Sequence, residues 1–291
     1  MSVITQHTPG LVSVIIPTYN HGKYLLEALE SIWSQKYPLI EVIIVDDGSI
    51  DNTKEIIAAI TGVKYVYQNN QGLSAARNTG VKNSNGEYFL FLDADDWLLP
   101  GSISTNVSYL KKDDSLAFVS GAHEKIFVDT GKSEEEAQVI SQHHYLHFLQ
   151  GNYIGMHATV MYRSWVFKEF LYDINLQACE DYDLYFKISR KCPVLHHTAK
   201  IAAYRIHDAN MSGNIPMMLN TVLMVLDRQK SVLDNKDEKS AFKNGHKVWK
   251  EYYTLLLYQR LLKSKASFTK DAFIMLLKYN PKLLIKYILK K

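Results

Sequence analysis

Short apolar segments with strand character alternate with helix-like segments over the first 92 residues, and this alternation limits the fold more than any other feature. The strand-like segments are rich in Val, Ile or aromatic residues and stop at polar or turn-forming residues, as buried strands do. They cover Val12–Ile16, Glu41–Val45, Val63–Tyr67 and Tyr88–Leu92. Apolar residues recur at helical spacing between them, over Lys23–Gln35, Thr53–Ile60 and Leu73–Lys82. This order predicts an α/β fold with a mostly parallel central sheet flanked by helices.

The pattern beyond Pro100 is mixed at first and then wholly helical. The expected strands are Leu116–Val119, Lys125–Val128, Met156–Tyr162 and Ile201–Ile206, with the polar segment Gly121–Glu124 joining the first two. The expected helices are Ser133–Leu149, which has an acidic start, and Asp181–Arg190. From Met217 onward the chain is rich in Leu, Tyr and Lys at helical spacing. We therefore predict two domains, residues 1–214 and a helical C-terminal extension over residues 215–291.

Composition is that of an ordinary water-soluble protein, with 47% hydrophobic and 22% charged residues. No apolar run reaches the ~18–20 residues of a membrane span. The N-terminus lacks the basic and apolar regions of a secretory signal, and Cys179 and Cys192 stand at no metal-binding or redox spacing. We therefore expect a cytoplasmic protein with free thiols.

The C-terminal region is strongly basic. From Ala241 to Lys291 there are twelve Lys or Arg and two Asp or Glu, a net charge of +10, which leaves −7 for the preceding residues out of the chain's total of +3. Apolar residues alternate with Lys at helical spacing from Trp249 onward, which is typical of helices that lie on an anionic membrane surface. There are two alternatives. The helices could pack on the first domain with their lysines facing the solvent, or they could form a homodimer interface. The Arg-poor composition and long apolar face disfavour nucleic acid.

Polar clusters follow three of the first four predicted strands. Pro17–Asn20 follows the first strand, Asp46–Ser49 the second and Asp93–Asp96 the fourth. Because the carboxyl ends of parallel strands meet at one edge of a sheet, where α/β proteins bind ligands, these clusters predict one site. The D-x-D spacing of Asp93 and Asp95 suits Mg²⁺ or Mn²⁺, which bind few protein oxygens together with phosphate oxygens. The alternative to a metal site is a turn whose carboxylates are simply hydrated, because a D-x-D spacing also occurs by chance.

Six motifs together resemble the family 2 glycosyltransferases of the GT-A fold, in the family's order and over roughly Val12 to Ser212. They are Val12-Ser-Val-Ile-Ile-Pro-Thr-Tyr-Asn20, Val45-Asp-Asp-Gly-Ser49 with Asp51 and Thr53, Gly72-Leu-Ser-Ala-Ala-Arg-Asn78, Leu92-Asp-Ala-Asp-Asp96, Glu180-Asp-Tyr-Asp-Leu184, and Tyr204-Arg-Ile-His207 with Ser212. The resemblance implies a GT-A fold and transfer of a sugar from a nucleoside-diphosphate sugar. The last ~75 residues are not covered, because this family's C-terminal regions vary.

The resemblance assigns the donor nucleotide to the first part of the chain. Asp47, with Asp46, would accept a hydrogen bond from uracil N3–H, a charge-assisted contact. The other donor contacts that it implies are Pro17, Thr18, Tyr19, Gly72, Arg77, Asp93 and Ala94. For Asp46 and Asp47 the alternative is an ordinary β-turn at a strand end. For Arg77 the alternative is a surface arginine on an amphipathic helix.

The resemblance also implies the metal site and the base. Asp95, Asp93 and His207 would hold Mn²⁺ or Mg²⁺ at the donor's diphosphate, where the metal stabilises the leaving group. Asp181 would be the general base of an inverting transfer, taking the proton of the acceptor hydroxyl. Glu180 beside it would contact the acceptor or orient the loop. Acidic residues that merely begin a helix are the alternative for Glu180 and Asp181.

Trp97 and His157 are the remaining acceptor candidates. Trp97, just past the metal turn, has the flat apolar ring that stacks on sugars, and a buried aromatic anchor is its alternative. His157 stands where acceptor contacts often fall in this family.

Three other classes of protein compete with this interpretation. A dinucleotide-dependent oxidoreductase needs a G-x-G-x-x-G turn after the first strand, and Pro17–Gly22 does not have one. A nucleotidyltransferase needs a Gly/Arg/Lys-rich phosphate loop, which is absent from the same place. A non-catalytic nucleotide-sugar-binding module has no use for a base such as Asp181. The expected donor is a UDP-sugar, with dTDP and GDP open, and the expected acceptor is a saccharide or lipid-linked saccharide of bacterial surface polysaccharide.

Overall fold

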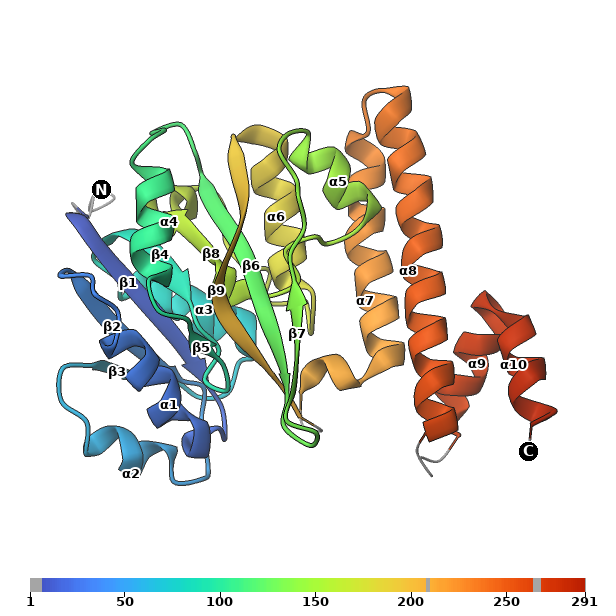
Figure 1. The fold of residues 1–291 in the computed structure, drawn as a ribbon, viewed down its shortest axis with the longest axis horizontal. Helices are drawn as coiled ribbons and strands as arrows, with labels where there is room; N and C mark the ends of the chain where they lie inside the picture. The colour runs from blue at the N-terminus through green and yellow to red at the C-terminus, as the bar shows by residue number, and fades with distance from the viewer. Residues whose placement is uncertain (1–6, 208–209, 264–267, 291) are drawn as a thin grey trace. The chain divides into compact units, whose positions relative to one another are not determined.

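The structure is a computed structural model that describes residues 7–207, 210–263 and 268–290. The chain divides into two compact units (Figure 1). The first holds residues up to 144 together with residues 153–207, and the second holds residues 145–152 together with residues from 208 onward. The domain boundary expected near Asn214 stays a prediction.

Nine strands form one mixed sheet in the described part of the first unit. They are β1 (Thr8–Thr18), β2 (Ile40–Asp46), β3 (Lys64–Tyr67), β4 (Gly86–Phe91), β5 (Trp97–Leu98), β6 (Phe118–Phe127), β7 (Lys132–Glu136), β8 (Val160–Arg163) and β9 (Val194–Ile206). Their order is β3-β2-β1-β4-β8-β6-β9-β5, with β7 paired to β6. The pairs among β1 to β4 are parallel, and β8 joins this half antiparallel to both β4 and β6. The predicted parallel core is confirmed, and the second half of the sheet is mixed.

Helices cover both faces of this sheet, as the alternation along β1 shows. Val14 and Ile16 belong to the same apolar cluster as Leu25 of α1 (Gly22–Trp33). Ile15 points to the opposite face, where it lies against Gly80 of α3 (Leu73–Lys82). The other helical segments of this unit are α2 (Thr53–Ala58), α4 (Ser102–Leu110), the 3₁₀ turns His157–Thr159 and Ser164–Lys168, and α6 (Glu180–Lys191).

Three sequence-based predictions beyond Pro100 are wrong in part. The segment Gly121–Glu124 does not interrupt a strand, because β6 runs through it. The expected helix Ser133–Leu149 begins instead as strand β7, which turns back on β6 at Gly131 in the left-handed region. The expected strand Met156–Tyr162 opens with the 3₁₀ turn His157–Thr159 before β8.

The acidic run of β7 explains the error over Ser133–Leu149. Glu136 pairs with Lys125 of β6 at 2.6 Å, and Glu135 with Lys200 of β9 at 3.3 Å. These cross-strand ion pairs stabilise a strand with the same acidic residues that suggested a helix start. Helix α5 forms only over the apolar end of the segment, at His144–Gln150.

The described part of the second unit is helical, as predicted. Its main helices are α7 (Ile215–Asp227), α8 (Lys236–Lys263), α9 (Lys270–Tyr279) and α10 (Pro281–Ile288), with 3₁₀ turns at Met211–Gly213 and Arg228–Val232. Asn214 caps α7 by accepting a hydrogen bond from the Met217 backbone N–H. None of the helices in the described ranges is both long and apolar enough to span a bilayer.

Candidate active site

The ends of β1 and β2 meet at one edge of the sheet and are joined by their loops. Thr18 and Asp46 are register partners, and the Asp47 N–H donates to the Thr18 carbonyl at 2.9 Å. Asn20, at a positive φ of 56°, accepts from the Ile50 N–H through its side chain at 2.8 Å. Two of the three strand ends that the sequence predicted to converge, those of β1 and β2, therefore lie together, and hydrogen bonds between their loops fix the backbone.

Asp47 organises the loop that leads into α3. Its carboxylate accepts from the Gln68 side chain at 2.6 Å, from the Gln71 N–H at 2.9 Å and from the Gly72 N–H at 2.8 Å. Asp46 accepts from the Ser49 N–H at 2.8 Å and from the Tyr65 hydroxyl at 2.9 Å. Both carboxylates are buried, so these bonds stabilise their charge away from water.

The other donor candidates differ in exposure. Pro17, Thr18 and Ala94 are buried, whereas Tyr19 and Gly72 are exposed. Gly72 has φ +89°, a conformation that favours glycine, and a Cβ added there would meet no neighbouring atom. The constraint at Gly72 is therefore backbone conformation, which aims its N–H at Asp47.

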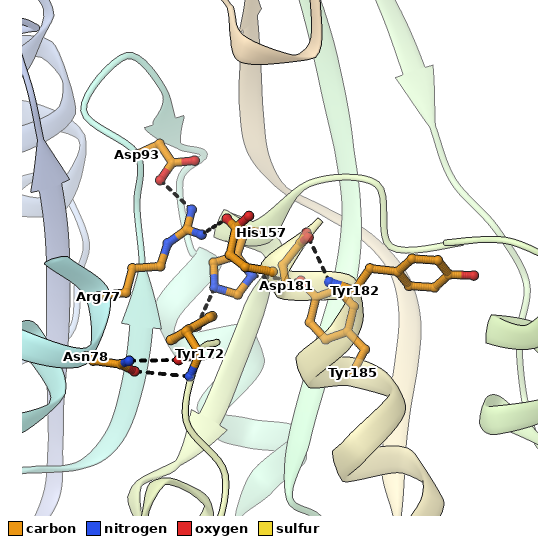
Figure 2. Close-up of polar contacts among 9 residues, drawn as sticks. Arg77, Asn78, Asp93, His157, Tyr172, Asp181, Tyr182 and Tyr185 are labelled. Carbon is orange, nitrogen blue, oxygen red and sulfur yellow. Dashed lines mark hydrogen bonds and ion pairs between the residues drawn. The ribbon is translucent and has the colours of Figure 1, made fainter. Parts of the chain in front are cut away.

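Arg77 joins two carboxylates that are far apart in sequence. Its guanidinium donates to Asp93 at 2.7 Å (Figure 2), and it forms a second ion pair with Glu180. The Arg77 side chain is 2% exposed, so the alternative of a surface arginine is wrong. Burial opposes the Arg77 charge, but Asp93 and Glu180 outweigh it and raise the pKa of the guanidinium well above its ordinary value. The site thus holds a fixed positive charge between the end of β4 and the start of α6.

Asp181 is a half-buried residue next to this ion-pair cluster. Burial first, and then the Glu180 charge, raise the pKa of Asp181 to about 7, while Arg77 opposes the shift. A carboxyl with a pKa near neutrality exchanges a proton at physiological pH, as a general base must. The backbone just before it is strained, because Cys179 lies in the left-handed region with φ 56°.

A buried aromatic cluster lies beside Asp181 and explains its desolvation. His157 has both ring nitrogens in hydrogen bonds, one to the Tyr185 hydroxyl and one to the Tyr172 hydroxyl, each at 2.7 Å (Figure 2). Asn78 holds the Tyr172 backbone on both sides, donating to its carbonyl at 2.9 Å and accepting from its N–H at 3.1 Å. The structure therefore buries His157 and occupies both of its ring nitrogens with tyrosine hydroxyls. Its role as an acceptor contact stays a prediction.

Asp95 and His207 meet as the sequence predicted. The Asp95 carboxylate and His207 Nε2 are 3.1 Å apart, and the His207 ring stacks on Tyr24 of α1 with centroids 5.3 Å apart. No group of three or more His, Cys, Asp or Glu that could hold a metal ion occurs within residues 7–207, 210–263 and 268–290. Asp95 and His207 thus bring one carboxylate and one ring nitrogen together at this place, and their role as metal ligands stays a prediction. Asp93 instead faces Arg77.

Arg205 fixes the turn that carries Asp95. Its N–H donates to the Asp96 carboxylate at 2.9 Å and its Nε to the Asp95 carbonyl at 2.8 Å. The guanidinium also pairs with Glu27 and lies over the Trp97 ring at 4.7 Å. Trp97 is therefore held by Arg205, and its role as an acceptor contact stays a prediction.

The sequence argument missed four residues of this site. Tyr172 and Tyr185 carry no motif, and their hydrogen bonds to His157, which lies 15 and 28 residues away in the sequence, result from packing between separate segments. Tyr24 has no signal beyond helical spacing. Arg205 had one, because it stands in the Tyr204-Arg-Ile-His207 motif, of which only His207 was assigned.

Comparisons with known proteins identify the family of this chain. The family model described as "Glycosyl transferase family 2" matches residues 13–171, which include Asp95 but not Asp181 or His207. An uncharacterised glycosyltransferase of Rickettsia typhi is 37% identical over 218 residues, 70% of this chain and 66% of that protein. The chondroitin synthase of Escherichia coli is 31% identical over 69% of this chain and 30% of that protein. This chain spans two thirds or less of the length of these relatives.

Solved structures with the same fold are distant in sequence. The S. aureus TarS 1–349 structure in complex with UDP-GlcNAc has a TM-score of 0.67 at 18% identity, covering 92% of this chain and 80% of that chain. A Pyrobaculum calidifontis mannosyltransferase in complex with GDP-Man and Mn²⁺ has a TM-score of 0.60 at 16% identity, covering 96% and 86%. The fold is therefore that of the GT-A glycosyltransferases. With more than half of its length matched by the family model, the chain belongs to glycosyl transferase family 2.

Proposed function

We propose that this protein transfers a sugar from a nucleoside-diphosphate sugar, with a UDP-sugar as the first candidate, to a hydroxyl of a saccharide or lipid-linked saccharide. The acceptor class that we propose belongs to surface-polysaccharide synthesis. The observation that carries the proposal is the position of the Asp181 carboxyl beside the buried ion pairs of Arg77 with Asp93 and Glu180, where burial also raises its pKa to about 7. A binding module has no need of a carboxyl that changes protonation at neutral pH.

Two kinds of observation support the donor assignment. Related folds have been solved with UDP-GlcNAc, UDP and GDP-Man bound. In addition, the buried Thr18 Oγ, Ser74 Oγ and Arg77 Nε have no hydrogen-bond partner within the described residues. Because buried polar atoms are rarely left without partners, polar atoms of a ligand are a natural complement to them.

The residues near Asp95 fit a hard divalent cation. Asp95 offers a carboxylate and His207 a ring nitrogen, 3.1 Å apart, whereas the Asp96 carboxylate already accepts from Arg205. This donor set suits Mn²⁺ or Mg²⁺ with phosphate oxygens as the remaining ligands. Such a metal would supply positive charge to the departing diphosphate. We assign Asp95 and His207 to this role.

In the proposed mechanism Asp181 accepts the proton of the acceptor hydroxyl. The acceptor oxygen forms a bond to the anomeric carbon from the face opposite the leaving group, so the configuration inverts. The bond between the anomeric carbon and the phosphate oxygen breaks, and its electron pair leaves with the nucleoside diphosphate. Glu180 is held by Arg77, which keeps the first turn of α6 and hence Asp181 in place. The strain at Cys179 is consistent with a position fixed for function.

The first test combines donor binding with turnover of Asp181→Asn. We expect one of UDP, GDP or dTDP to raise the melting temperature in the presence of Mn²⁺. Asp181→Asn should lower sugar transfer about 10²–10⁴-fold, because a general base contributes that much. Nucleotide affinity should change less than about threefold, because the base acts in the transition state.

Asp129→Asn is the matched control, because Asp129 is an exposed carboxylate outside the site. Its transfer rate should equal that of the wild type. Near-full transfer by Asp181→Asn would mean that another group is the base. Nucleotide binding without transfer to any saccharide tested would favour a non-catalytic module.

A further inference from the structure

The last two helices form a hairpin that packs on α8 within the second unit. The Asn280 side chain caps α10, and its amide donates to the Thr254 hydroxyl of α8 at 3.4 Å. Tyr287 of α10 stacks on Phe268 with ring centroids 4.9 Å apart. The buried contacts are made by one side of each helix, namely Ala272, Met275, Leu276, Leu284 and Tyr287. The hairpin is therefore anchored, and its other side is left to the solvent.

That other side carries large apolar residues, which we name the exposed apolar stripe. Its members are Phe273, Ile274 and Leu277 of α9 and Ile285, Ile288 and Leu289 at α10. Their exposed fractions run from 40% at Phe273 to 81% at Leu289. Single exposed apolar residues need no explanation, but six on two adjoining helices form a surface that favours a partner.

Lysines accompany the exposed apolar stripe. Lys270, Lys278, Lys282, Lys286 and Lys290 are all exposed, and Asp271 is the one acidic residue between Lys270 and Lys290. At about 100° per residue, α10 has three distinct sectors. Leu284 and Tyr287 point inward, Ile285, Ile288 and Leu289 occupy the next sector, and the lysines occupy the third. An apolar sector bordered by a cationic one is the pattern of a helix that lies in a membrane interface.

We propose that the exposed apolar stripe and its lysines bind the surface of a bilayer that contains anionic lipids, with α9 and α10 lying in the plane of the interface. The charge argues against a second copy of this chain, because a symmetric contact would bring the lysines of two hairpins together. A soluble polyanion would satisfy the lysines but leave the apolar residues in water. An anionic bilayer satisfies both, since its headgroups attract lysine and its acyl region takes up Ile and Leu. This inference does not depend on the proposed transferase activity.

The experiment is flotation of the full chain with vesicles of phosphatidylcholine alone or with 30% phosphatidylglycerol. We expect binding to the anionic vesicles, little binding to the neutral ones, and loss of binding at high salt. The variant Lys282→Gln, Lys286→Gln and Lys290→Gln should bind about 100-fold more weakly, because each lysine near an anionic surface contributes several-fold. Ile285→Ser, Ile288→Ser and Leu289→Ser should also bind at least about tenfold more weakly, by losing apolar burial.

A control variant tests whether vesicle binding needs these particular lysines or only the positive charge of the protein. Lys111→Gln, Lys112→Gln and Lys132→Gln removes three exposed lysines of the first unit and should bind like the wild type. The lysine variants change exposed side chains alone, so they decide the matter even where the serine variant folds poorly. Equal binding by the Lys282/Lys286/Lys290 variant and the wild type would overturn the proposal. A wild-type dimer in sedimentation equilibrium that the serine variant abolishes would also overturn it, in favour of a second copy.

Discussion

At the residue scale, one arginine shows what a sequence can and cannot reveal. The Arg77 motif allowed either a surface role or a ligand contact, and nothing local separates the two. The structure excludes the surface role, because Asp93 and Glu180, 16 and 103 residues away, surround the guanidinium, and the ligand contact stays a prediction. Tyr172 and Tyr185 beside His157 were not predictable, because they follow from packing between distant segments. In contrast, Asp95 and His207 were predicted together and lie together.

The same cluster predicts the pH dependence of turnover. A base must be deprotonated to act, so kcat/KM should rise with pH through an apparent pKa of about 7, that of Asp181. Because the Glu180 charge raises the pKa of Asp181, Glu180→Gln should move this acidic limb to lower pH. The measurement is nucleoside-diphosphate release against pH. Glu169→Gln, which alters an exposed glutamate paired with Lys191, should leave the limb in place. If the acidic limb of the pH profile stays at the same pH in Glu180→Gln, the titrating group is not Asp181.

At the element scale, the repeating strands and helices before Pro100 were predictable because each buries a periodic apolar face. Strand β7 was not, because its acidic residues suit a helix start and a cross-strand ion pair equally well. The positions of Lys125 on β6 and Lys200 on β9, which only the fold reveals, decide that these acidic residues form a strand and not a helix start. Contacts between strands thus determine the secondary structure of this segment, against its local preference for a helix.

The close contact of α3 with β1 makes a stability prediction. A Cβ at Gly80 would lie 2.3 Å from Ile15 Cγ2, and Ile15 is fully buried in a central strand. Gly80→Ala should therefore lower the free energy of unfolding by about 1–3 kcal/mol, despite the higher helix propensity of alanine. Gly151→Ala is the control, because a Cβ there meets no atom within 4 Å. Urea denaturation measures both, and equal stabilities would show that β1 and α3 move apart at little cost.

At the scale of the whole molecule, the division into units was only partly visible in the sequence. The sequence beyond residue 214 pointed to a helical C-terminal region. The grouping of residues 145–152 with that region was hidden, because it depends on contacts such as the hydrogen bond from the Tyr145 hydroxyl to Gln229 at 3.2 Å. A segment embedded in one part of the sequence can belong to another part of the structure.

Buried histidines predict weaker folding in acid. Burial lowers the pKa of His123, His196 and His197 from 6.5 to about 4, and it also lowers the pKa of His157 well below 6.5. The unfolded chain therefore binds more protons than the folded chain between about pH 6.5 and 4. Stability therefore falls as pH drops from about 6.5 toward 4. Asp96 and Asp181 have raised pKa values, so their protonation stabilises the folded chain as the pH falls. We expect the four histidines to outweigh these two carboxyls.

Urea midpoints at pH 7.5, 6 and 5 test this expectation. His123→Leu should flatten the pH dependence, because it removes a buried histidine whose ring nitrogens have no partner within the described residues. His143→Gln changes an exposed histidine and should leave the pH dependence as it is. A midpoint that does not change between pH 7.5 and 5 would contradict the prediction.

The single positive charge shared by Asp93 and Glu180 has a consequence for how two substrates meet. Arg77 divides its attraction between a carboxylate on the proposed donor side and one on the proposed acceptor side. A ligand that neutralises Asp93 leaves more of that attraction for Glu180, and the reverse holds equally. By thermodynamic reciprocity, each substrate then changes the affinity for the other by the same factor. The affinities for the two substrates would thus be coupled through one buried side chain.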